Sequence, residues 1–162
     1  MAASGLRMYN EAKKYLMDGT IDLDVDGDFY IHLAQSGSNA STYTLSALSE
    51  ITNELASANG YNKAGNILTA QTWSANAAST MRFDGSVDKW SANGGNLGSA
   101  SASMNIAYAF LVAVTGTSAK DGANKLMGWW NLTATPFQVT DTNSLTLTIN
   151  ASGIFELSGA TT

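Results

Sequence analysis

The sequence predicts a mostly β protein, a β-sandwich or jelly roll with one short N-terminal helix. Three observations lead to this prediction. A clear amphipathic helical pattern occurs near the start of the chain, and most segments after it have the short patterns of strands. Turn signals such as Asp26-Gly27 and Asn59-Gly60 separate these segments. The length of 162 residues suits one domain with a substantial core.

The helix is predicted over residues 5 to 18. Residues of its inner face recur at intervals of three and four, namely Leu6, Tyr9, Ala12, Lys13 and Leu16. Ser4 occupies a capping position and Gly19 follows the last turn. We expect residues 1–5 to form a flexible arm that reaches a neighbouring subunit, and residues 6–158 to form a single β-sandwich domain.

The strands are predicted from alternating or β-rich segments between turns. Ile21, Leu23 and Val25 alternate with aspartates, and the clearer candidates are Phe29 to Leu33, Tyr61 to Leu68, Thr72 to Trp73, Thr80 to Phe83, Met104 to Thr115, Lys125 to Leu132, Ser144 to Asn150 and Gly153 to Leu157. The segment Leu45 to Leu55 fits a short helix or an irregular strand, and we favour the helix. Ser91 to Ser103 is a low-complexity segment, for which we expect a long surface loop.

The composition favours protein contact over nucleic-acid or membrane binding. Charged residues make up 13% of the chain and the net charge is −5, so the surface is polar but weakly charged. Nucleic acid demands a basic patch, and the eight Lys and Arg residues are scattered. The longest apolar run, Ile106 to Val114, is too short to cross a bilayer. Few charges would need desolvation when a protein partner docks.

Asp22, Asp24 and Asp26, followed by Gly27, imitate the start of an EF-hand calcium loop. The pattern fails at its twelfth position, where a bidentate Glu is required and Leu33 stands. We therefore expect these aspartates to be solvated and to bind no metal. The sequence predicts no cofactor. There are no cysteines to supply thiolate ligands.

His32, the single histidine, lies within a predicted strand and has no nucleophile motif near it, so we expect a structural role. Trp129 and Trp130 are adjacent and must point to opposite faces of a strand. We assign Trp130 to the core and Trp129 to an exposed edge or interface. The four tryptophans could instead form a sugar-binding platform, although most aromatic residues in a β protein belong to the core.

Four segments of the chain form a pattern through their order and spacing. They are MYNEAKKYLMDGTIDLDVDGDFYIHLA, SEITNELASANGY, KLMGWWNL and LTLTINASGIFEL. This pattern resembles a family of small virion structural proteins of tailed bacteriophages, and the similarity extends from Met8 to Leu157. In that family a short helix ends in a Gly-Thr-Ile-Asp-Leu-Asp type turn, and the chain closes on an Asn-Ala-x-Gly-Ile strand. The Trp-Trp pair and the longer Ser-rich middle depart from the family pattern.

The resemblance implies a non-enzymatic capsid decoration, or cement, protein on the outer surface of a phage particle. Its expected partners are the major capsid protein and further copies of itself, as a dimer or trimer. The start of the chain has no apolar run of signal-peptide length, so we expect synthesis in the cytoplasm of the bacterial host. For the interface we expect Met1, Leu6, Met8 and Trp129. The alternative is a tail-fibre or adhesin module that binds glycans on the host surface.

Overall fold

The computed structural model describes residues 5–24, 29–98 and 105–158. It confirms a mostly β chain with one short helix near the N-terminus. The elements in chain order are β1 (Arg7–Met8), α1 (Asn10–Met17), β2 (Phe29–Gln35), the 3₁₀ turn η1 (Leu48–Glu50), β3 (Asn66–Ala77), β4 (Thr80–Val87), β5 (Trp90–Ser91), β6 (Ile106–Ala113), β7 (Lys125–Asn131), β8 (Ser144–Leu145) and β9 (Phe155–Ser158).

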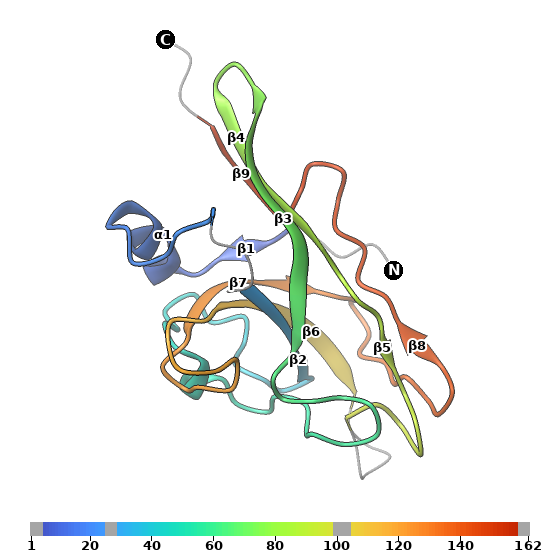
Figure 1. Ribbon diagram of the computed structural model, residues 1–162. Coiled ribbons are helices and arrows are strands. Elements are labelled where there is room, and N and C mark those ends of the chain that lie inside the picture. The colour runs from blue at the N-terminus through green and yellow to red at the C-terminus, as the bar shows by residue number, and fades with distance from the viewer. Residues whose placement is uncertain (1–4, 25–28, 99–104, 159–162) are drawn as a thin grey trace.

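Seven of these strands form one antiparallel sheet that curls over itself, in the order β1-β7-β6-β2-β3-β4-β9 (Figure 1). In the described part of the chain, β5 and β8 form a second, two-stranded sheet. The sandwich-like layering therefore arises mainly from the curl of one sheet. β3 and β4 form a long hairpin that projects beyond the body of the protein, and β9 lies along β4 (Figure 1).

The core lies on both faces of the central strands. Residues that are directly opposite in an antiparallel pair share a face. Leu33, Ala109 and Trp130 share one face, whereas His32, Phe110 and Trp129 share the other. The first face continues to the Phe29–Phe83 and Phe83–Phe155 ring contacts, with centroids 5.1 and 5.4 Å apart. α1 and the segment between β2 and β3 cover the second face, because Tyr9 and Tyr43 both contact Trp129.

The predicted helix over residues 5 to 18 is wrong at its start, since α1 begins at Asn10. Arg7 and Met8 form β1 instead and pair with Trp129 and Gly128 of β7. A Cβ on Gly128 would lie 2.8 Å from the Arg7 carbonyl oxygen, so glycine is what allows this close pairing. The gain from strand pairing overrides the helical spacing of Leu6 and Tyr9. Ser4, the expected cap, lies outside the described residues.

Two other local predictions are corrected. The helix expected over Leu45 to Leu55 is reduced to the single turn η1. Ile21 and Leu23 are buried, but they belong to turns and not to a strand. The low-complexity segment also contributes to the core, because Leu97 is 2% exposed and its backbone N–H donates to the Val139 carbonyl at 2.9 Å. Of that segment, residues 99–103 lie outside the description.

Glu50 is the last residue of η1, and its hydrogen bonds predict that acid lowers the stability of the protein. Its carboxylate accepts the backbone N–H groups of Ser46 and Ala47 at 2.6 and 3.0 Å. These bonds hold the pKa of Glu50 below its usual range. A carboxyl whose pKa is lowered by folding stabilises the protein above its unfolded pKa, and that contribution disappears as the pH falls through the folded pKa. Because Glu50 is exposed, Glu50→Gln should cost at most about 1 kcal/mol at pH 7.

Urea unfolding of both proteins at pH 7 and near pH 3 measures this effect. The difference between wild type and Glu50→Gln should shrink as the pH falls. A difference that is the same at both pH values would contradict the assignment.

Candidate functional site

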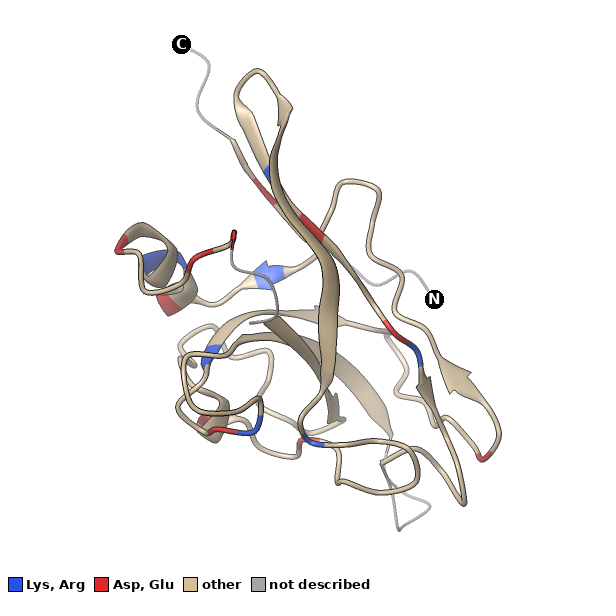
Figure 2. Cartoon of the chain, viewed as in Figure 1, with Lys and Arg blue, Asp and Glu red and all other residues tan. Residues whose placement is uncertain are grey.

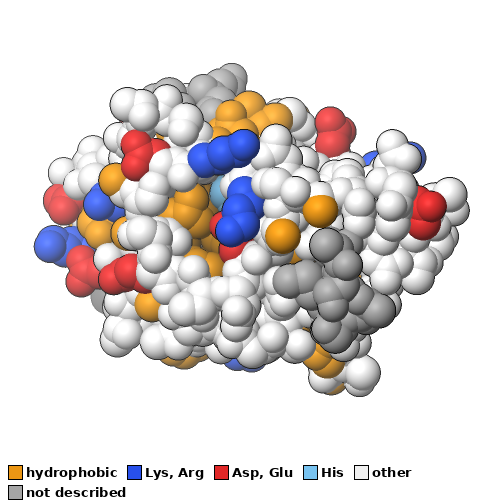
Figure 3. All heavy atoms as spheres, turned by 90° about the horizontal axis from the view of Figure 1, so that it is seen from below, with side chains coloured by type: hydrophobic (Ala, Val, Ile, Leu, Met, Phe, Trp, Pro, Cys, Tyr) orange, Lys and Arg blue, Asp and Glu red, His pale blue; other side chains and the backbone are white. Residues whose placement is uncertain are grey.

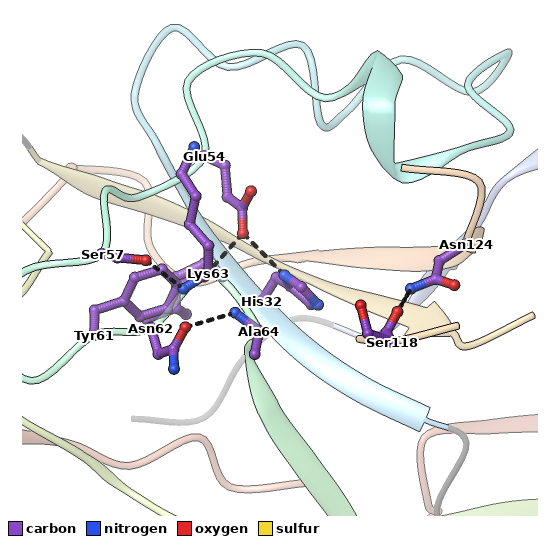
Figure 4. A network of polar contacts seen from close by, with 10 residues as sticks. His32, Glu54, Ser57, Tyr61, Asn62, Lys63, Ala64, Ser118 and Asn124 are labelled. Atoms are coloured by element: carbon purple, nitrogen blue, oxygen red, sulfur yellow. Dashed lines mark hydrogen bonds and ion pairs between the residues drawn. The ribbon is translucent and has the colours of Figure 1, made fainter. Parts of the chain in front are cut away.

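A buried polar network surrounds His32 of β2. Its Nδ1 lies 2.9 Å from Oε1 of Glu54, and the same oxygen accepts a hydrogen bond from the Tyr61 hydroxyl at 3.3 Å (Figure 4). The Tyr61 oxygen in turn accepts the backbone N–H of Leu33 at 3.0 Å. Burial, followed by the nearby Glu54 carboxylate, raises the pKa of Tyr61 well above its ordinary value. The hydroxyl therefore stays protonated and continues to donate to Glu54.

This network completes the edge of β2 where β3 no longer pairs with it. β3 pairs with β2 only at Tyr30 and Ile31. Beyond that point, the N–H of Leu55 donates to the Leu33 carbonyl at 3.0 Å, and the Tyr61 hydroxyl satisfies the Leu33 N–H. Buried backbone groups need such partners. The segment between β2 and β3 thus supplies both a strand-like edge and the polar groups that hold His32.

The His32–Glu54 pair has the geometry of an oriented base, but substrate has no access to it. Figure 3 shows the histidine at the floor of a hollow, between hydrophobic and basic side chains, and its side chain is 0% exposed. Within the described residues, Nε2 has no hydrogen-bond partner, so no nucleophile is aligned on it. Gly65 covers the ring, since a Cβ there would lie 3.0 Å from Nε2. These contacts indicate a structural role for His32, which holds the segment between β2 and β3 against the sheet.

The aspartate segment does not assemble a metal centre in the described part of the chain. Asp22 and Asp24 are exposed, and Asp22 Oδ1 accepts the backbone N–H of Asp24 at 2.9 Å, which is a turn contact. Asp26 lies outside the described residues. Over residues 5–24, 29–98 and 105–158, the structure shows no group of three or more potential His, Asp or Glu ligands.

The predicted interface residues are placed very differently by the fold. Trp129 is fully buried, so its assignment to an exposed edge is wrong. The ring centroids of Tyr9 and Tyr43 lie 4.8 and 4.6 Å from its own, because α1 and the segment after β2 cover this second face of the sheet. Leu6 and Met8 are partly buried and pack against the protein's own core. Met1 lies outside the described residues.

The aromatic residues do not form an open platform for sugar. Trp90, Trp129 and Trp130 are all at most 4% exposed, and Trp73 is partly buried. Tyr43 is more open, but it packs edge-on against Trp129. The adhesin alternative therefore loses three of the four tryptophans on which it depends.

A shallow groove with a largely apolar lining is open at the surface. It lies between the end of α1, the turns after it and the projecting hairpin, and its volume is about 350 Å³. Its apolar lining consists of Leu16, Met17, Ile21, Leu23, Trp73 and Leu157. Met17 is 87% exposed and Leu157 is 43% exposed. No local sequence pattern predicts this groove, because its residues come from segments that are far apart in the chain.

The charged residues are spread out around the molecule. Figure 2 shows them on the helix, on strands and in loops, with no large cluster of Lys and Arg in the described part of the chain. No helix among the described residues is both long and apolar enough to cross a membrane. No protein-family model, curated protein sequence or solved structure matches the chain.

Proposed function

We propose that this protein is a non-enzymatic decoration protein that binds the outer surface of a tailed-phage capsid and stabilises the shell. The proposal rests on the resemblance of four ordered sequence segments to small phage virion proteins. The structural observation that supports it best is the exposed groove beside a projecting hairpin, which six apolar side chains line. Such a surface can be desolvated at low cost when a protein partner docks.

The surroundings of His32 also favour binding over catalysis. Its hydrogen bonds with Glu54 and, through Glu54, with Tyr61 join the covering segment to β2. Because His32 is hydrogen-bonded in this way and is buried, it cannot meet a substrate without local opening of the fold. The proposed activity is therefore adhesion to a repeating lattice, in which each weak contact is multiplied by the number of sites.

A decoration protein should strengthen shells without being needed to close them. A ligand that binds only the assembled state stabilises it by about 2.7 kcal/mol per site at a free concentration of 100 times Kd. We expect the purified protein to sediment with preformed shells at a copy number near that of the major capsid protein. Decorated shells should also rupture at a higher temperature than bare shells, as followed by light scattering.

Bovine serum albumin mixed with the same shells controls for nonspecific sedimentation. If the protein leaves the shells unbound and instead binds glycans of the host surface on an array, the decoration proposal fails and the adhesin alternative replaces it.

A further inference from the structure

The hairpin of β3 and β4, with β9, has one apolar and one polar face. Trp73, Phe83 and Phe155 stand opposite one another across the three strands. The next row outward on the same face contains Ala75, Met81 and Leu157. The other face carries the row Ser74, Arg82 and Glu156. This alternation is the pattern of a sheet that buries one face.

Only the inner part of that apolar face is covered by the protein itself. Phe83 is 0% and Phe155 is 9% exposed, whereas Leu157, one row further out, is 43% exposed. Met17, at the end of α1, is 87% exposed and lines the same groove as Leu157 and Trp73. Single exposed apolar residues are common, but a contiguous set at a groove marks an interaction site.

The outer edge of β9 indicates which backbone conformation a partner bound at the groove would have. β9 is the last strand of the sheet, and its four residues pair on one side with β4. Its other side meets no strand in the described part of the chain. An unpaired edge presents backbone N–H and C=O groups that an extended segment of another chain can pair with.

The rim of the groove indicates the charge of the occupant. Asp22 and Asp24 line the groove and are exposed. Asp18, directly after α1, is also exposed, and hydrogen bonds from the side chain and backbone of Thr20 hold its pKa below the usual range. The rim therefore carries three exposed acidic side chains. A basic side chain on the partner would be attracted to this rim.

We propose that an extended segment of the capsid protein docks along β9, inserts a large apolar side chain into the groove and places a Lys or Arg beside Asp22 and Asp24. This inference rests on the proposed function, because it identifies the surface through which the protein holds the shell. Backbone pairing with β9 supplies affinity, while the groove and the acidic rim select the side chains.

Site-specific photo-crosslinking on purified shells tests the location directly. A benzophenone amino acid is placed at position 157 in one protein and at position 74 in the other. Ser74 is the matched control, since it is exposed on the polar face of the same hairpin. We expect crosslinks to the capsid protein from position 157 and few or none from position 74.

Binding of surface variants to the same shells tests the chemistry. Met17→Ser combined with Leu157→Ser should weaken binding roughly tenfold or more, whereas Ser74→Ala should leave it unchanged. Asp22→Asn with Asp24→Asn should weaken binding at low salt and approach wild type at about 0.5 M salt. The asparagine at position 22 retains the side-chain oxygen that accepts the Asp24 N–H. Unchanged melting temperatures of the free proteins show that the variants fold.

The outcomes separate this inference from the proposed function. If wild type binds shells but the apolar variant binds equally well, or crosslinks arise only from position 74, the surface is wrong and decoration stands. Crosslinks from position 157 to another copy of this protein would replace the capsid segment by self-association. If wild type does not bind shells at all, both the function and the inference fail.

Discussion

Replacing Trp129 with alanine should cost about 3–5 kcal/mol of stability, a loss large enough to unfold many domains of this size. The indole is 0% exposed and is held between Tyr9 and Tyr43, with centroids 4.8 and 4.6 Å away. Alanine would leave a cavity between the sheet and its cover of α1 and the segment after β2. Urea unfolding should show the loss directly, and each kcal/mol should lower the melting temperature by about 2–4 °C.

Two further variants separate the loss of packing from other effects. Trp129→Phe retains a ring and removes Nε1, which is buried without a hydrogen-bond partner among the described residues, so it should cost much less than alanine. Tyr43→Ala should also cost less, because Tyr43 is 48% exposed. A Trp129→Ala protein with an unchanged unfolding midpoint would contradict the buried position and restore an interface role.

Gly65→Ala should destabilise the protein by about 2–5 kcal/mol, through backbone strain and collision together. Gly65 has a φ of +66°, which disfavours any residue with a Cβ. A Cβ at this position would lie 2.6 Å from the Ile31 carbonyl oxygen and 2.8 Å from Cδ2 of His32. The covering segment would have to move away from β2, which would strain the His32–Glu54 bond. Denaturant unfolding measures the loss.

Gly19→Ala is a matched control, because Gly19 has a positive φ like Gly65 but an added Cβ there would collide with nothing. Its φ is +76°, and a Cβ there would have nothing within 4 Å. It should cost only about 1–2 kcal/mol. Equal losses in the two variants would mean that the segment over His32 adjusts freely, and the proposed role of Gly65 would be wrong.

Patterns that depend on neighbours along the chain were predicted well. The strands around Phe29 to Leu33, Met104 to Thr115 and Lys125 to Leu132 correspond to β2, β6 and β7, because their composition and bounding turns act locally. Gly19 ends α1 with a positive φ, as expected of a residue that follows a helix. Segments whose partner lies far away in the chain were predicted poorly. Arg7 and Met8 form a strand only because β7 pairs with them.

The candidate surface could not be found from the sequence for the same reason. Met17, Trp73 and Leu157 are each unremarkable apolar residues, and only the fold brings them to one groove. Trp129 shows the opposite error, since strand alternation correctly separates it from Trp130 but does not reveal that the second face is also covered.

By itself, the sequence determined the mostly β fold class, because strand alternation and turn residues are properties of short segments. The curl of the sheet was decided only by the tertiary structure. Contacts between residues that are distant in the sequence bury Trp129 and bring His32 to Glu54. They also form the open groove at Leu157. Such contacts follow from how whole faces pack against one another, which no local pattern encodes.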